Sequence, residues 1–246
     1  MYERFAELYD ELMYDVDYEK IAEFIFDILK KHKIDDGLVL DLACGTGVLT
    51  RKLSEYGYDM TGIDLSEEML LKAREKSDSS ILYLEQDMTE FELYGTMRAI
   101  VCSMDGFNYL TDKDDFFKTL KLCHNYLDPD GVLIFDINSE YKLKNILGNN
   151  TFVFDSDNVF YTWENEFDEE SELCDFYLTF FVKNENGEYA RVNEEQTERA
   201  YKTEDVEKML KTAGFKVLNK YNGYSSQKAN SKSERIVFEC IKTEEK

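Results

Sequence analysis

The sequence predicts an α/β fold, a doubly wound and mostly parallel sheet with an antiparallel β insertion after strand five. Up to residue 137, short apolar runs alternate with segments of helical periodicity, and parallel neighbours in a sheet require such crossover connections. Residues 151–200 break this rhythm, because four aromatic-rich runs are separated there by polar turns, a pattern typical of antiparallel strands.

The elements before the insertion follow from apolar periodicity and capping signals. The first helix has one apolar face and a basic end, which suits its negative C-terminal dipole. Ser66 caps the third helix, Thr111 opens the fourth in a capping-box-like stretch, and the turn 128–131 ends that helix. The expected elements are helices over 18–31, 48–56, 67–76 and 111–127, and strands over 38–40, 59–64, 82–85, 99–102 and 132–137.

The later elements divide into the insertion and a closing unit. Thr203 is expected to cap a helix that Gly214 ends, because a residue without Cβ suits a helix C-terminus. The expected strands lie over 152–154, 160–163, 176–182 and 189–192 in the insertion, and over 215–220 and 235–241 after it.

These elements predict two units in one chain. Residues 1–150 and 201–246 form the main domain, and residues 151–200 form an inserted antiparallel subdomain with 14 acidic and three basic residues, a net charge of −11. Two interpretations of the insertion stay open. It leaves the sheet on the ligand side and so can cover the crevice as a lid, or it is a solvated acidic hairpin that blunts a sheet edge.

Composition and charge exclude several classes of protein. A chain of 246 residues, 43% hydrophobic, buries enough surface to fold without disulfides or metals. Its net charge of −23 disfavours DNA, because phosphates are repelled. Five scattered cysteines outside any Cys/His cluster predict reduced thiols and no metal site. Without a signal-peptide pattern or a membrane-length apolar run, we expect a cytoplasmic protein.

Three successive strands of the predicted sheet end in residues that suit a nucleotide. Gly45 and Gly47 follow the first strand and let a ligand approach the backbone closely. Asp64 ends the second strand, where a carboxylate accepts hydrogen bonds from a ribose diol, and Asp87 follows the third, where it can meet an adenine amino group. Ligands of open α/β sheets bind at the carboxyl ends of the strands, so we expect one shared crevice.

The glycine loop favours S-adenosylmethionine over a dinucleotide. A dinucleotide site has Gly or Ala where this chain has Thr50, and its helix N-terminus faces a pyrophosphate. Asp41, at the entrance of the loop, would repel a pyrophosphate but can bind the ammonium of an amino-acid tail. An NAD-dependent oxidoreductase remains the weaker alternative.

Four segments resemble successive signatures of class I S-adenosylmethionine-dependent methyltransferases: LDLACGTG at 40–47, GIDLS at 62–66, QDM at 86–88 and LDPDG at 127–131. The match is strong over residues 37–137 and extends by topology over 199–241. The pattern of Tyr, Phe, Leu and Met over residues 2–13 is similar to that of small stand-alone bacterial methyltransferases. The resemblance implies a seven-stranded Rossmann-like sheet with an antiparallel seventh strand, and S-adenosyl-L-methionine as the cofactor.

The resemblance also implies cofactor contacts residue by residue. It implies that Asp41, Gly45 and Gly47 contact the methionine end of the cofactor and that Asp64 contacts the ribose. It implies that residues after the second and third strands contact the adenine. Met69 is one of these residues, and its alternative role is packing in the core. The complete implied set is Asp41, Ala43, Cys44, Gly45, Thr46, Gly47, Asp64, Leu65, Met69, Asp87, Met88 and Ser103. Ala43 stands where the family often has a first glycine, and alanine is common there.

Substrate contacts are expected from three regions of the chain, each with an ordinary structural role as its alternative. The candidates are Asp105 and Asn108 beyond the fourth strand, Tyr9 and Tyr14 near the N-terminus, and Tyr161, Trp163 and Arg199 in the insertion. Methyl transfer from a sulfonium needs mainly alignment of nucleophile, carbon and sulfur, so no catalytic residue is assigned. His32 and His124 lie at helix ends and are expected to be structural.

The leading interpretation is a bacterial, cytoplasmic methyltransferase that acts on a small-molecule acceptor, with no membrane partner. An RNA methyltransferase is the second interpretation, because residues 202–242 carry nine basic and five acidic residues. A third is a non-catalytic assembly module that retains the cofactor pocket. Salt-sensitive RNA binding separates the second from the first, and cofactor binding without turnover identifies the third.

Overall fold

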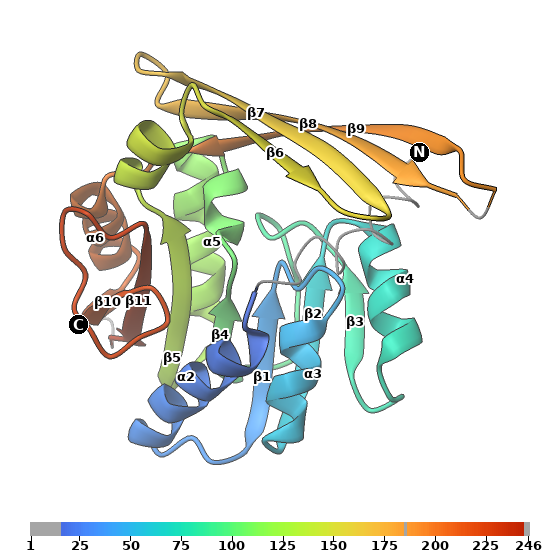
Figure 1. Cartoon of the computed structure of the whole chain (residues 1–246). Coiled ribbons are helices and arrows are strands. Elements are labelled where there is room, and N and C mark those ends of the chain that lie inside the picture. Colours follow the sequence, from blue (N-terminus) through green and yellow to red (C-terminus); the bar gives the residue numbers. More distant parts are fainter. Residues whose placement is uncertain (1–15, 185, 244–246) are drawn as a thin grey trace.

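The computed structural model describes residues 16–184 and 186–243. Its main sheet has seven strands in the order β10-β11-β5-β4-β1-β2-β3 (Figure 1). Neighbouring strands from β3 to β5 pair in parallel, whereas β11 is antiparallel to both β5 and β10. The strands are β1 (Gly37–Leu42), β2 (Tyr58–Asp64), β3 (Leu82–Glu85), β4 (Met97–Cys102), β5 (Leu127–Asn138), β10 (Phe215–Asn222) and β11 (Arg235–Lys242). The predicted doubly wound sheet with an antiparallel last strand is confirmed.

Helices cover both faces of this sheet, because successive side chains of the central strands enter opposite cores. Val39 of β1 packs in the core under α2 (Tyr18–Lys31) and α3 (Val48–Glu55), and Leu40 packs in the core under α5 (Lys113–Tyr126) and α6 (Thr203–Thr212). α4 (Glu67–Lys76) closes the sheet edge, where Leu70 and Ala73 pack on Tyr83 of β3. None of the described helices has the length and apolar character that a membrane span requires.

Three predicted boundaries are wrong. Asp112, not Thr111, caps α5, because its carboxylate accepts from the Asp114 amide at 2.8 Å. Residues 128–131 form no turn ahead of the strand. They lie within β5 as an irregularity between the pairs Met97–Leu127 and Ala99–Val132. Thr203 is the first residue of α6, and the preceding cap residue makes no side-chain capping bond.

The insertion forms a second, antiparallel sheet in the order β6-β7-β8-β9, which lies across the end of the main sheet where the parallel strands finish (Figure 1). Its strands are β6 (Thr151–Asp155), β7 (Val159–Asp168), β8 (Leu173–Lys183) and β9 (Tyr189–Arg199). One end packs on the π-helical segment η2 (Lys142–Leu147), and the other contacts Met69 of α4 through Val159 and Phe180. The second sheet therefore bridges two sides of the main domain.

Candidate functional site

The loop after β1 has a backbone that requires glycine. Gly45 and Gly47 have φ angles of +54° and +69°, and Ala43 reaches +59° in the same left-handed region. A Cβ on Gly47 would overlap the hydroxyl oxygen of Tyr83. The loop is therefore held in a conformation in which the space beside Gly45 is open to a ligand. A positive φ at a residue other than glycine, as at Ala43, is a backbone strain that is common at functional sites.

Asp64, the last residue of β2, holds this loop. Its Oδ2 accepts a hydrogen bond from the Gly45 amide at 2.7 Å, and its Oδ1 accepts from the Ser66 amide at 2.9 Å. Burial raises the pKa of the carboxyl, and the backbone donors oppose that rise. Each carboxylate oxygen keeps a further lone pair, so Asp64 can still accept hydrogen bonds from a diol.

Asp41, in β1, is buried beneath the same loop. The Thr50 hydroxyl donates to its Oδ2 at 2.6 Å. Burial raises the pKa of Asp41 to about 7, the hydrogen bond from Thr50 opposes the rise, and the Asp64 carboxylate adds to it. Two acids this close together lower the energy of a nearby cation, so the loop suits a ligand with positive charge at this end.

The other predicted cofactor residues lie along the same sheet edge. Cys44 donates its amide to the carbonyl of Ile63 at 2.9 Å, and Asp87 accepts from the Thr89 amide at 2.7 Å in the turn after β3. Leu65 is 69% exposed, so it adds apolar surface beside Asp64 that protein does not cover. Of the other predicted cofactor residues, Thr46 is buried, and Met69, Met88 and Ser103 are partly buried.

Asp105, predicted as a substrate contact, belongs to a cluster of buried charges at the ends of β4 and β5. Its Oδ1 lies 2.6 Å from Nη2 of Arg235, and its amide donates to Oδ2 of Asp136 at 3.1 Å. Arg235 also forms an ion pair with Asp136, whose Oδ1 accepts from the Tyr224 hydroxyl. Met104 and Asp105 both have positive φ angles, +57° and +59°, so the backbone is strained here as well.

Asn108 is fully buried, and its amide group is committed to the backbone. Its Nδ2 donates to the carbonyls of Asn138, at 3.0 Å, and Arg199, at 2.9 Å, while its Oδ1 accepts from the Asn138 amide at 2.9 Å. Asn108 therefore joins the main domain to the last strand of the insertion. Its predicted contact with substrate stays untested, and its hydrogen bonds favour a positioning role.

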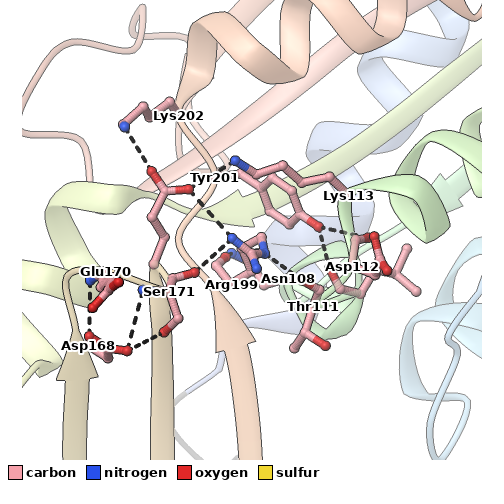
Figure 2. A network of polar contacts seen from close by, with 12 residues as sticks. Asn108, Thr111, Asp112, Lys113, Asp168, Glu170, Ser171, Arg199, Tyr201 and Lys202 are labelled. Carbon is pink, nitrogen blue, oxygen red and sulfur yellow. Dashed lines mark hydrogen bonds and ion pairs between the residues drawn. The ribbon is translucent and has the colours of Figure 1, made fainter.

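Arg199 is held in a network that fastens the insertion to the main domain (Figure 2). Its guanidinium donates to the carbonyls of Thr111 and, at 2.9 Å, Ser171. Glu172, in the β7–β8 turn, accepts from Lys113 at 3.0 Å and from Lys202 at 2.8 Å. These lysine hydrogen bonds lower the pKa of Glu172 to about 2. The Arg199 guanidinium is thus engaged with protein, although it was expected to meet substrate.

The remaining predicted substrate residues fall into two groups. Tyr9 and Tyr14 lie outside the described residues. Tyr161 stacks on Phe154 with centroids 5.2 Å apart, and Trp163 meets Phe176 edge-on at 5.7 Å. Among the described residues, the Trp163 indole nitrogen has no hydrogen-bond partner. No group of three or more His, Cys, Asp or Glu is placed to hold a metal within 16–184 and 186–243.

Three site residues were not anticipated: Asn138, Lys142 and Glu198. Lys142 donates to Oδ1 of Asn138 at 2.8 Å, and Nδ2 of Asn138 donates to Glu198 at 2.9 Å. Glu198 is 2% exposed and pairs with buried Cys174 on the inward face of the insertion. An acid at an inward position of an alternating strand was the available signal, and it was hidden among the acids of β9.

Comparison with known proteins gives concordant results. A family model described as a methyltransferase domain matches residues 39–131. A crystal structure of an S-adenosylmethionine-dependent methyltransferase from Clostridium acetobutylicum ATCC 824 is 41% identical, with a TM-score of 0.91 over 99% of each chain. YqeM of Bacillus subtilis (strain 168) is 37% identical over 99% of this chain and 98% of its own. A dTDP-3-amino-3,6-dideoxy-alpha-D-glucopyranose N,N-dimethyltransferase of Streptomyces fradiae is 29% identical over 53% of this chain and 52% of its own.

Proposed function

The chain belongs to the S-adenosylmethionine-dependent methyltransferases, and from this premise we propose that it methylates a small, unphosphorylated acceptor in the cytoplasm. S-adenosylmethionine supplies an activated methyl group on a positively charged sulfur. The observation that carries the proposal is the pair of buried carboxyls, Asp41 and Asp64, beneath a loop with an open backbone. Such a site stabilises a cationic amino-acid tail and a ribose diol, and it repels a pyrophosphate.

We assign the cofactor's parts to this chain's residues as follows. Asp41, Gly45 and Gly47 bind the methionine end, and Asp64 accepts from the ribose hydroxyls. The exposed side chain of Leu65 and the turn after β3 would hold the adenine. Ser103, which follows β4, flanks the methyl-bearing end. Gly45, Asp64, Leu65 and Ser103 keep surface that protein does not cover, which supports their assignment because a cofactor needs such surface, whereas Asp41 and Gly47 are buried.

The insertion supports a small acceptor. It lies over the ligand-binding end of the sheet, touches both η2 and α4, and carries a net charge of −11. We propose that residues 151–200 are an inserted subdomain that acts as a lid. A covering sheet of this charge disfavours phosphates and tolerates neutral or cationic acceptors.

The basic segment 202–242 gives little support to an RNA acceptor, because many of its cations are already paired. Lys202 contacts Glu172, Lys208 contacts Asp205, Lys220 contacts Glu207, and Arg235 contacts Asp105. Lys242 donates to the carbonyl of Leu127. Cations with local partners release fewer counterions on binding RNA and add less affinity.

Calorimetric titration with S-adenosylhomocysteine, with NADH titrated in parallel, tests the proposed cofactor site. We expect micromolar binding of S-adenosylhomocysteine and none of NADH. The reverse result would contradict the cofactor assignment. Binding of S-adenosylhomocysteine with no methyl transfer to fractionated small-molecule extracts would favour the non-catalytic module.

A further inference from the structure

We propose that Glu198 and Asp105 together bind the nitrogen of an amine acceptor, whose ammonium group supplies the cation that this buried cluster of charges lacks. The proposal deepens the proposed function and rests on it, because it names the acceptor class for the same site. It also makes the insertion part of the chemistry, since Glu198 lies near the end of β9 and Asp105 lies in the main domain.

The carboxyl pair lies next to the loop assigned to the cofactor's methionine end. Asp105 lies in the turn that follows β4, and a Cβ added to the next residue, Gly106, would lie 3.2 Å from Cβ of Ala43. The side chain of Asp105 is 14% exposed and Glu198 is 2% exposed, so a ligand would have to reach the pair from the side of Asp105. An acceptor nitrogen at this position would stand beside the methyl-bearing end of the cofactor.

The charges of the cluster do not balance without a further cation. Its three carboxyls are those of Asp105, Asp136 and Glu198, and its two cations are Lys142 and Arg235. Arg235 contacts Asp105 and Asp136 directly, whereas the Asn138 amide separates Lys142 from Glu198. A buried carboxylate without a counter-charge is costly, so one carboxyl must take up either a proton or an external cation.

Glu198 is the carboxyl that takes the proton in the free protein. Burial, together with the neighbouring Asp105 carboxylate, raises the pKa of Glu198 well above its usual range. Burial acts on Asp105 in the same direction, but the Arg235 and Lys142 charges outweigh it and lower the pKa of Asp105. The pKa of Lys142 is itself lowered by burial and by Arg235.

The other titratable groups that face the pair stay uncharged at neutral pH. Burial raises the pKa of the Cys174 thiol, which lies opposite Glu198 on β8, and that of the Cys102 thiol at the end of β4. Burial also raises the pKa of Tyr224, which hydrogen-bonds to Asp136. None of these groups therefore adds a charge to the cluster.

This arrangement fits an amine and gives a complete proton balance. A protonated amine enters as a cation, and the proton of Glu198 leaves to solvent. The ionised Glu198 then accepts a proton from the ammonium, which frees the nitrogen lone pair. That lone pair forms the N–C bond while the C–S bond breaks and its electron pair stays on sulfur. The product leaves as a methylated ammonium, and Glu198 keeps its proton, so each turnover releases one proton to solvent.

The pair can be tested by carbon NMR on protein labelled at the glutamate carboxyls and saturated with S-adenosylhomocysteine. The Glu198 signal is assigned by its absence in Glu198→Gln, and methylammonium and methanol are the probes. We expect Glu198 to keep its proton to higher pH than exposed glutamates, and methylammonium to weaken that proton affinity by about tenfold. Methanol should leave it unchanged. Titration together with the exposed glutamates, or no response to methylammonium, would overturn the proposal.

Glu195→Gln is the matched control, because Glu195 lies on the same strand and is exposed. It makes the same substitution away from the cluster and should leave the methylammonium response intact, whereas Asp105→Asn should shift the Glu198 titration toward that of exposed glutamates. Binding of S-adenosylhomocysteine should be equal in wild type, Glu198→Gln and Glu195→Gln. If wild type fails to bind it, the proposed function fails. If wild type binds S-adenosylhomocysteine but methylammonium leaves the titration of Glu198 unchanged, only the proposed amine site is refuted.

Discussion

The site has a cofactor half, around Asp41 and Asp64, and an acceptor half, around Asp105 and Glu198. The contacts that build the two halves differ greatly in how far apart their residues lie in the sequence. In the cofactor half, Asp64 binds Gly45 and Asp41 binds Thr50, over separations of 19 and nine residues. In the acceptor half, Asn138 binds Glu198 across 60 residues, and Arg235 binds Asp136 across 99. The first half is a local motif on three adjacent strands. The second exists only after β11 and the insertion have docked, so its side chains determine stability as well as function.

The largest effect is expected from breaking the acceptor half at Arg235. Arg235→Ala leaves the Asp105 and Asp136 carboxylates buried without their cation, and loss of one partner of a buried ion pair costs about 3–5 kcal/mol. Urea unfolding at neutral pH measures the loss. Lys220→Ala removes a more exposed ion pair with Glu207 and should cost less than about 1 kcal/mol. Equal costs for the two variants would refute the contrast.

The cofactor half should lose binding more than stability. Asp64→Ala removes the proposed ribose acceptor and the bond that holds the Gly45 amide, each a charge-assisted hydrogen bond of about 1.5–3 kcal/mol. We expect affinity for S-adenosylhomocysteine to fall about a hundredfold with the fold retained, as measured by calorimetry and far-ultraviolet circular dichroism. Asp59→Ala, an exposed acid on the same strand, is the control and should bind normally. Unchanged affinity in Asp64→Ala would contradict the site.

The pH dependence of cofactor binding should identify Asp41. An ammonium ligand favours the ionised carboxylate, so affinity should rise as the pH increases through the pKa of about 7 in the free protein. The expected gain for S-adenosylhomocysteine between pH 6 and pH 8 is about tenfold, because the competent form grows from a minor to the major species. Asp41→Asn should abolish this slope, and a slope that persists in the variant would assign the titration elsewhere.

The same group links pH to folding with the opposite sign. Asp41 keeps its proton in the folded protein at pH values where the unfolded chain has lost it. Its contribution to the free energy of unfolding is therefore complete below the unfolded pKa of about 4 and is lost as the pH rises through about 7. Ligand-free wild type should become less stable over this range relative to Asp41→Asn.

The contrast in contact range also explains what the sequence could predict. Asp41, Gly45 and Asp64 could be recognised because each directly ends or follows a short apolar run, and strand ends of a parallel sheet converge. Inward register separates Glu198 from Glu195 but not from Glu194, which lies on the same face of β9 four residues earlier. Only the long-range contact with Asn138 separates Glu198 from Glu194. Asp112 displaced Thr111 as the α5 cap for a similar reason, since adjacent capping residues differ only in backbone geometry.

A smaller effect is expected where the insertion is fastened, at Glu172. Glu172→Gln weakens the contacts with Lys113, Lys202 and Arg199, and because both lysines are about half exposed we expect a cost near 1 kcal/mol. The lowered pKa means that the stabilisation is present above the unfolded pKa and is lost as the pH falls toward about 2. Urea unfolding at several pH values tests this. Glu169→Gln, whose carboxylate is 74% exposed, should have no measurable effect.

The smallest change in unfolding free energy is expected for Trp163→Phe. The same variant tests whether Trp163 packs within the insertion or contacts the acceptor. Its indole nitrogen is buried without a hydrogen-bond partner among the described residues, so Trp163→Phe removes an unsatisfied donor while it also removes ring surface packed on Phe176. These effects oppose each other, and the net change in unfolding free energy should lie within about 0.5 kcal/mol. Phe176→Leu, which only removes packing, should cost about 1 kcal/mol or more. If the indole instead donates to the acceptor, Trp163→Phe will raise KM for the acceptor and leave S-adenosylhomocysteine affinity unchanged, which would move Trp163 from the packing of the insertion into the acceptor half of the site.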